Sequence, residues 1–192
     1  DLALLAPSVL AMKCLLECCS EFGAKYHVLF NASKSKYIFF GQKSLRPTVS
    51  PFLLDGNCIE LVDSEKHLGN AFGNDFMKVL VNDAVNVFNC KVNMVISHFK
   101  HLNHICKYTL FKTYCMPLYG AQLWDLDCKY VEKMFVSWRK AIRRLFNLPY
   151  TTHRCLLPLL CHDQPVEQQI HKRSIYFIHS LSQSNNPIIS LC

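Results

Sequence analysis

The strongest constraint in this sequence is a set of apolar residues between positions 75 and 102 that recur every three or four residues. This spacing puts them on one side of an α-helix. The apolar members of the set are Phe76, Leu80, Ala84, Val87, Phe88, Val92, Val95 and Phe99. The other side of the helix carries four asparagines, which are Asn82, Asn86, Asn89 and Asn93. Residues 75–102 are therefore predicted to form one long amphipathic helix or two helices in succession.

A second amphipathic helix is expected shortly before Pro149. It begins near Asp127 as the N-cap and ends before the proline, because proline disfavours helical backbone in the residue that precedes it. On a helical wheel of about 100° per residue, Lys140 and Arg144 fall within about 20° of Lys133. The opposite side is apolar, so this helix is predicted to bury one side and to present a basic side to solvent.

Two further helical segments complete the C-terminal part of the chain. Residues 104–116 keep a helical pattern up to Pro117, and residues 166–181 form another such stretch before a polar end. The chain is therefore predicted to be helical almost throughout from residue 75 onward.

The first third of the chain combines one helix with short strands. Ser8 is expected to cap a helix that ends near Gly23. Residues 28–30 and 37–40 have the composition of strands, and the turn Asp55-Gly56-Asn57 predicts a hairpin because Asp-Gly supports positive φ angles. The predicted fold class is α+β, mostly α, with a small β/α part followed by a helical bundle and a helical C-terminal connection.

Composition argues against a disordered or membrane-spanning chain. Of the 192 residues 51% are hydrophobic and 18% are charged, which is enough apolar surface for a core. The longest segment without a formal charge, residues 174–192, is too polar to cross a hydrocarbon layer of about 30 Å. The eleven cysteines are odd in number and form no C-x-x-C pair, so reduced thiols and an intracellular location, in the cytoplasm or the nucleus, are expected.

The formal net charge of +7 belongs entirely to the C-terminal part. Residues 1–74 hold seven basic and seven acidic residues, whereas residues 75–192 hold fourteen and seven. Residues 84–124 and 133–154 contain several basic residues and no acidic one. Such segments suit a polyanion, because each neutralised phosphate releases counterions, while a solvated face that aids solubility is the alternative. The candidate nucleic-acid-binding residues are Lys91, Lys100, Lys107, Lys112, Lys133, Arg139, Lys140, Arg143, Arg144 and Arg154.

Several short motifs follow one another along nearly the whole chain. They are Asp1-Leu2-Ala3-Leu4-Leu5, Phe30-Asn31-Ala32-Ser33-Lys34, Lys66-His67-Leu68-Gly69, Leu118-Tyr119-Gly120 and Trp138-Arg139-Lys140-Ala141. The ordered set resembles the reverse transcriptases of non-LTR, LINE-type retrotransposons, starting inside their YADD signature. The resemblance implies the C-terminal part of an RNA-directed DNA polymerase. It assigns residues 1–74 to the end of the palm, residues 75–149 to a helical thumb and residues 150–192 to a helical connection after the thumb.

The resemblance also implies a catalytic role for Asp1. In that family two adjacent aspartates and a third from an earlier strand hold two Mg²⁺ ions, which activate the primer 3′-hydroxyl and stabilise the leaving pyrophosphate. Asp1 matches the second of the adjacent pair, and the remaining ligands and most of the palm are expected upstream. One carboxylate cannot hold Mg²⁺ in octahedral geometry. The chain is therefore expected not to polymerise by itself, and Mg²⁺ is expected only in the intact parent enzyme.

Three more roles follow from the resemblance. Lys34 matches a lysine that approaches the incoming nucleotide and is implicated in protonating the leaving pyrophosphate, although an ordinary turn lysine is the alternative. His67, Leu68 and Gly69 match the primer-grip loop. The basic helices match the thumb, which lies along the RNA template and DNA primer and contacts their phosphates without reading sequence. Neither a membrane nor a specific protein partner is implied.

Other interpretations of these residues remain open. The alternative hypothesis is a non-enzymatic nucleic-acid-binding or interaction module left from a decayed or domesticated element. His98, His101 and His104 do not have the spacing of a zinc site, because successive members differ by about 300° around a helix. Trp124 and Trp138 could stack on bases, but Trp138 lies on the apolar side of its helix and is predicted to belong to the core.

Overall fold

The computed structural model describes residues 2–41, 50–74 and 76–186. It is 52% helical with 9% strand, which confirms the predicted α+β class with mostly α structure. The chain divides into two compact units, Asp1–Phe76 and Met77–Cys192. Among the residues described, no helix is both long and apolar enough to cross a membrane.

The first unit begins with α1 (Val9–Tyr26), which starts as predicted. The Ser8 hydroxyl accepts a hydrogen bond from the Ala11 N–H at 3.1 Å and so satisfies one of the open donors of the first turn. The helix continues beyond Gly23, so its predicted end was too early. His27 closes it in the left-handed conformation, and its N–H donates to the Gly23 carbonyl.

Short strands follow α1 and pair two by two. They are β1 (Lys36–Tyr37), β2 (Leu53–Leu54), β3 (Asn57–Cys58), β4 (Glu60–Leu61), β5 (Ser64–His67) and β6 (Asn70–Gly73). β1 pairs with β4 in parallel, whereas β2 with β3 and β5 with β6 form antiparallel pairs. The strand predicted at residues 28–30 is wrong: the Val28 N–H is bound to Gly23 at the helix end, and Leu29 is 94% exposed.

Two tight turns join the antiparallel strands. Asp55 and Gly56 have φ angles of 50° and 75°, which confirms the predicted hairpin turn between β2 and β3. Leu68 and Gly69 have φ angles of 50° and 80° and join β5 to β6 in the same way. Two consecutive positive φ angles give the turn a twist that matches the flanking strands. Gly is favoured at the second position because it adopts a positive φ angle without steric cost.

The core of the first unit is small and combines aliphatic and aromatic side chains. Its buried members are Leu16 from α1 and Phe52, Leu54 and Ile59 from the strand region. The Tyr37 ring meets the Phe52 ring edge-on, with 4.8 Å between their centroids. Most of the side chains around these residues remain partly exposed.

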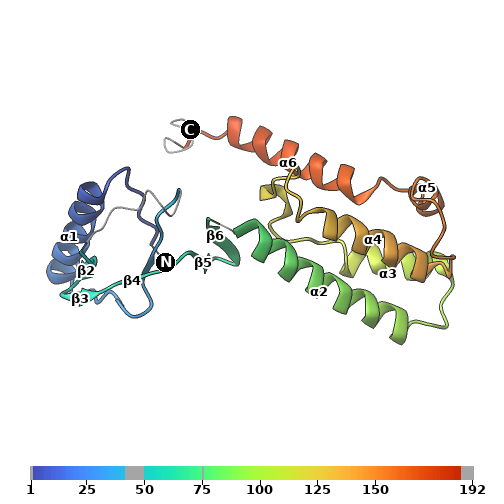
Figure 1. Cartoon of the computed structure of the whole chain (residues 1–192), viewed down its shortest axis with the longest axis horizontal. Coiled ribbons are helices and arrows are strands. Elements are labelled where there is room, and N and C mark those ends of the chain that lie inside the picture. The colour runs from blue at the N-terminus through green and yellow to red at the C-terminus, as the bar shows by residue number, and fades with distance from the viewer. Residues whose placement is uncertain (1, 42–49, 75, 187–192) are drawn as a thin grey trace. The chain divides into compact units, whose positions relative to one another are not determined.

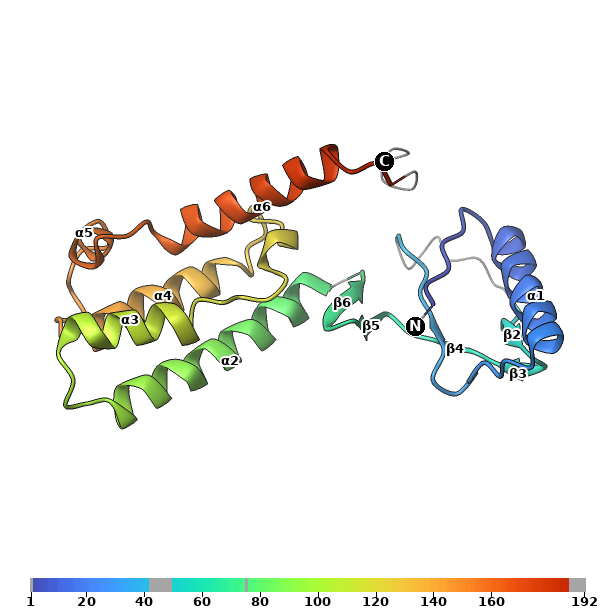
Figure 2. The same ribbon diagram turned by 180° about the vertical axis from the view of Figure 1, so that it is seen from behind.

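The second unit is a bundle of helices centred on one of them. The helices are α2 (Phe76–His98), α3 (His104–Tyr114), the 3₁₀ turn η2 (Ala121–Leu123), α4 (Glu132–Leu145), α5 (Leu156–Cys161) and α6 (Val166–Ser182). Both views of the ribbon show α4 between α2 and α6 (Figures 1 and 2). α4 also contacts α3 and α5, and α6 packs on η2.

The start of α4 differs from the prediction. Asp127 does not cap the helix, whose N-cap position is taken by Val131. It belongs instead to a preceding turn, in which its N–H bonds to the side chain of Asp125 at 3.1 Å. A second turn places the Val131 N–H on the Cys128 carbonyl at 2.9 Å, and regular helix begins only at Glu132.

α4 supplies the centre of the bundle core. Its buried side chains are Met134, Trp138, Ala141, Ile142 and Leu145. The predicted core position of Trp138 is therefore confirmed. Because α4 is covered by neighbouring helices on several sides, only part of its circumference is left for polar residues.

Candidate nucleic-acid interface

One row of cations on α4 faces solvent. Lys133, Lys140 and Arg144 are all exposed and follow one another along the same side of the helix. Trp138 and Ile142 lie on the opposite side and are buried. The position of the row agrees with the helical wheel drawn from the sequence.

The asparagines of α2 lie beside this row and hold two of its cations. Lys133 Nζ donates to Asn82 Oδ1 at 2.9 Å, and Arg144 Nη1 donates to Asn93 Oδ1 at 2.9 Å. The two asparagines are as far apart in the sequence as the two cations, so α2 and α4 run side by side in the same direction and register. Amide oxygens carry no charge, so these contacts orient the cations without neutralising them.

The carboxylates of α2 and α4 lie beside this surface and not in the row of cations. α2 and α4 contain one acidic residue each, Asp83 and Glu132. Asp83 is partly buried and lies about 100° around α2 from Asn82 and about 60° from Asn86, while Glu132 pairs with Arg139 on another side of α4. We name as the α2–α4 face the surface made of Asn82, Asn86, Asn89, Asn93, Lys133, Lys140 and Arg144. It combines cations that have no carboxylate partner among the described residues with amide donors and acceptors, which suits the backbone of a nucleic acid.

Two other predicted basic residues on α4 turn toward the protein. The Arg139 side chain is 16% exposed, pairs with Glu132, and donates from Nη1 to Glu167 Oε1 at 3.1 Å. Arg143 donates from Nε and Nη2 to the Thr152 carbonyl at 3.1 and 2.8 Å. These contacts tie α4 to the start of α6 and to the turn before α5, so the two arginines serve the fold.

Lys112 belongs to a cluster that joins α3 to the end of α5. Its Nζ lies 2.8 Å from Asp163 Oδ2, and the Tyr108 hydroxyl donates to the same oxygen at 2.9 Å. Burial raises the pKa of Tyr108 far above its ordinary value. Burial also acts to raise the pKa of Asp163, but hydrogen bonds from Lys112, the Gln164 N–H and Tyr108 outweigh it and hold that pKa below its usual 3.8. The charge of Lys112 is therefore largely compensated within the protein.

The remaining predicted basic residues of this unit lie apart from the α2–α4 face. Lys91 is partly buried on the side of α2 near Cys115. Burial raises the pKa of the Cys115 thiol to about 11, and the Lys91 charge opposes this shift. Lys100 and Arg154 are exposed in the turns after α2 and before α5, and Lys107 is partly buried on α3.

In the first unit Lys34 is presented by a turn that Asn31 builds. The Asn31 carbonyl accepts from the N–H groups of Lys34 and Ser35 at 3.1 and 3.0 Å. Its side-chain oxygen accepts from the Ser33 hydroxyl at 2.7 Å and again from the Lys34 N–H at 3.2 Å. The Lys34 side chain is exposed, so its ammonium can reach a phosphate from the solvent side.

His67, Leu68 and Gly69 form the tip of the β5–β6 hairpin. Leu68 has a left-handed backbone conformation, and its side chain is exposed. The His67 ring lies 6.4 Å from the Phe72 ring across the pair of strands. The tip therefore offers an apolar side chain and a tight turn that Gly69 makes possible.

The predicted metal ligand Asp1 lies outside the described residues. In the ranges that are described, no group of three or more His, Cys, Asp and Glu could hold a metal ion. His98 and His104 instead bind backbone carbonyls, with Nδ1 at 3.0 Å from Met94 O and at 3.1 Å from Leu145 O.

Two structural features were not predicted from the sequence. Trp124, considered as a base-stacking residue, is 5% exposed and belongs to the core. The asparagines of α2 were assigned to a polar side but not to the cations of α4. Their signal was present in the equal sequence spacing of Asn82 to Asn93 and of Lys133 to Arg144.

Comparison with protein families, curated proteins and solved structures gives no match to this chain. Its function is therefore inferred from its own residues.

Proposed function

We propose that the chain is the C-terminal part of a LINE-type reverse transcriptase, and that its helical unit holds the RNA–DNA hybrid through the α2–α4 face. The α2–α4 face is the observation that carries this proposal. Lys133, Lys140 and Arg144 are exposed in one row, two of them are oriented by neutral amides, and the carboxylates of both helices lie elsewhere. The ordered motifs of the sequence support the same assignment.

A duplex backbone fits this face better than base edges do. Side chains that read bases must enter a groove, whereas a row of cations on a helix can follow a line of phosphates. RNA–DNA hybrids are A-like, so recognition through shape, phosphates and 2′-hydroxyl groups is expected. Asn86 and Asn89 are exposed between the cations and can donate to or accept from such groups.

In the first unit the proposal gives Lys34 and the hairpin tip separate tasks. Lys34 would meet the phosphates of the incoming nucleotide, and residues 67–69 would contact the primer end. Both need the catalytic aspartates expected ahead of residue 1. They therefore concern DNA synthesis by a longer protein, whereas hybrid binding can be tested with the present chain.

The test is a titration of the full chain against a labelled RNA–DNA hybrid over a series of salt concentrations. Changing Lys140→Gln together with Arg144→Gln should weaken binding and lower the slope of log K against log salt by about two, because each phosphate contact adds about one. Lys13→Gln with Lys25→Gln is the matched control, since it removes the same charge from exposed positions of α1. Equal effects of the two double variants would contradict the proposal.

The non-enzymatic alternative shares the hybrid-binding surface and differs in its consequence. In a longer protein that carries the residues expected ahead of Asp1, the double variant on α4 should shorten the DNA made per binding event. A nucleic-acid-binding module from a decayed element would bind the hybrid in the same way and extend no primer.

A further inference from the structure

Two hollows lie next to each other along α6, away from the α2–α4 face. The first has a volume of about 380 Å³ and is lined by Gln164, Gln168, His171, Lys172, Ile175 and Tyr176. The second has about 550 Å³ and is lined by Pro158, Leu159, His162, Asp163, Gln164 and Lys172. Gln164 and Lys172 belong to both, so a cation and an amide lie at the boundary between the two spaces.

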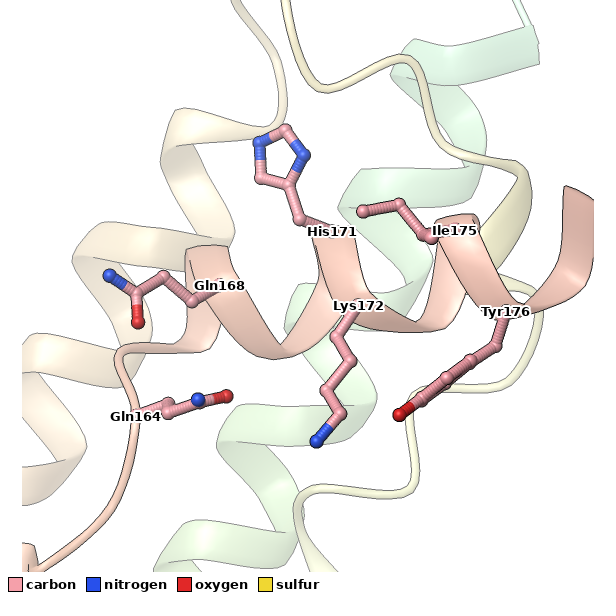
Figure 3. A pocket seen from close by; sticks show the side chains of 6 residues that line it. All are labelled: Gln164, Gln168, His171, Lys172, Ile175 and Tyr176. Carbon is pink, nitrogen blue, oxygen red and sulfur yellow. The ribbon is translucent and has the colours of Figure 1, made fainter. Parts of the chain in front are cut away.

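The first hollow combines an exposed ring with a nearby ammonium. Figure 3 shows Lys172 and Tyr176 extending to the same side of α6, with Gln164 at the end of the hollow. Lys172 Nζ lies over one face of the Tyr176 ring, 5.7 Å from its centroid, and Tyr176 is 62% exposed. A ring with a cation over one face can stack on a base with its other face while the cation contacts a phosphate.

The charges around the hollows favour an anionic occupant. Residues 168–182 contain no acidic residue. The Asp163 carboxylate in the lining of the second hollow pairs with Lys112, and the Glu167 carboxylate in the first turn of α6 pairs with Arg139. Within the described residues Lys172 has no carboxylate partner, so its charge is available at the boundary of the two hollows.

We propose that this side of α6 binds an unpaired stretch of nucleic acid, with Tyr176 stacked on one base and Lys172 on the phosphate that links it to the next. The second hollow would receive the neighbouring nucleotide. The Gln164 and Gln168 amides can bond to base edges, which single strands leave open. A duplex cannot use the site in this way, because its bases are stacked on each other.

This site is separate from the α2–α4 face and does not rest on the function proposed for that face. α6 meets α4 through Glu167 and Arg139. On α4, Arg139 lies about 120° from Lys133. The chain would therefore hold a hybrid and a single strand at the same time.

The experiment measures binding of a labelled oligothymidylate of about ten nucleotides to the full chain. The chain carries Lys140→Gln and Arg144→Gln throughout, so that the α2–α4 face contributes little. Tyr176→Ala should weaken binding about tenfold or more, and Tyr176→Phe should keep most of it, because stacking needs the ring and not the hydroxyl. Lys172→Gln should weaken binding and lower the salt slope by about 0.7.

Ile178→Ala is the matched control, because Ile178 is an exposed apolar residue of the same helix outside both hollows. It should leave oligothymidylate binding unchanged. Unchanged binding by Tyr176→Ala, or equal losses for Tyr176→Ala and Ile178→Ala, would overturn the proposal. So would sedimentation showing that Tyr176→Ala dissociates a dimer, because the exposed ring would then serve contacts between copies of the chain. Hybrid binding by the chain with Lys140 and Arg144 intact tests the other face independently.

Discussion

The two units bury their apolar side chains to different degrees. Twelve large side chains in the described residues are less than 2% exposed, and all of them lie in the helical unit. In the first unit the most deeply buried large side chain, Phe52, is still 3% exposed.

The difference follows from how each unit brings apolar side chains together. α4 presents a buried residue at nearly every turn to the helices around it, so the core of the bundle is continuous. Strand pairs of two to four residues offer few cross-strand contacts and are marginal by themselves. We therefore expect the helical unit to carry most of the stability and the first unit to depend on a few aromatic contacts.

The largest expected effect separates the two cores. Ile142→Ala should lower the free energy of unfolding of the helical unit by about 3 kcal/mol, because it leaves a cavity in a closed core. Both tryptophans, Trp124 and Trp138, lie in this unit, so urea unfolding followed by tryptophan fluorescence reports on it alone. Phe52→Ala should leave that transition unchanged within about 0.5 kcal/mol. A shift as large as that of Ile142→Ala would mean that the units unfold together.

A smaller effect is expected at the β5–β6 hairpin. Gly73 has a φ angle of 143°, and a Cβ at this position would lie 2.3 Å from the Asp63 carbonyl oxygen. Gly73→Ala should therefore destabilise the hairpin by about 2 kcal/mol, seen as faster amide hydrogen exchange in residues 64–73. Exchange in α4 should not change. Unaltered exchange throughout the hairpin would show that its backbone relaxes without cost.

The third effect tests the division of cations on α4. Arg139→Met should lower the stability of the helical unit by about 1 kcal/mol, because it breaks a network with two partly exposed glutamates. Lys140→Met, at the next position, should change stability by less than about 0.5 kcal/mol. Urea unfolding measures both, and equal effects would remove the distinction between a cation that serves the fold and one that serves binding.

The smallest expected effect is the loss, at low pH, of the stability that the Asp163 carboxylate contributes. Because the folded-state pKa of Asp163 is lowered, its carboxylate adds stability above the ordinary value of 3.8, and this contribution is lost as the pH falls through the lower folded value. Asp163→Asn should therefore be less stable than the wild type near neutral pH, and the gap should close in acid. Asp127→Asn changes an exposed carboxylate of the same unit and is the control. If Asp163→Asn remains less stable than the wild type in acid, the lost stability comes from packing and not from the carboxylate charge.

Local signals in the sequence predicted much of the fold. The Ser8 cap, the Asp55-Gly56 turn and the helical periodicity after residue 75 all depend on neighbours a few residues away, and the structure confirms them. The strand predicted at residues 28–30 was wrong, because the Val28 N–H donates a hydrogen bond to the Gly23 carbonyl at the end of α1. The predicted start of α4 near Asp127 was wrong, because Asp125 and Asp127 form a separate turn before the helix.

The candidate site was predictable only in part, because its selectivity depends on contacts between distant segments. The wheel placed Lys133, Lys140 and Arg144 together from their spacing alone. The same wheel sets Arg139 about 120° from Lys133, but it does not show which residues Arg139 contacts. Its partner Glu167 lies on α6, 28 residues further along the sequence.

The hydrogen bonds from Lys133 and Arg144 to Asn82 and Asn93 bear on the cost of association. A long side chain that is free in solution loses rotamer entropy on binding, at a cost of about 0.5–1.5 kcal/mol for each one immobilised. In these two residues part of that loss has already occurred during folding. A phosphate then has only to replace a neutral amide by a stronger, charge-assisted acceptor. In the proposed complex the asparagines would thus be temporary partners that keep the two cations extended until an anion takes their place.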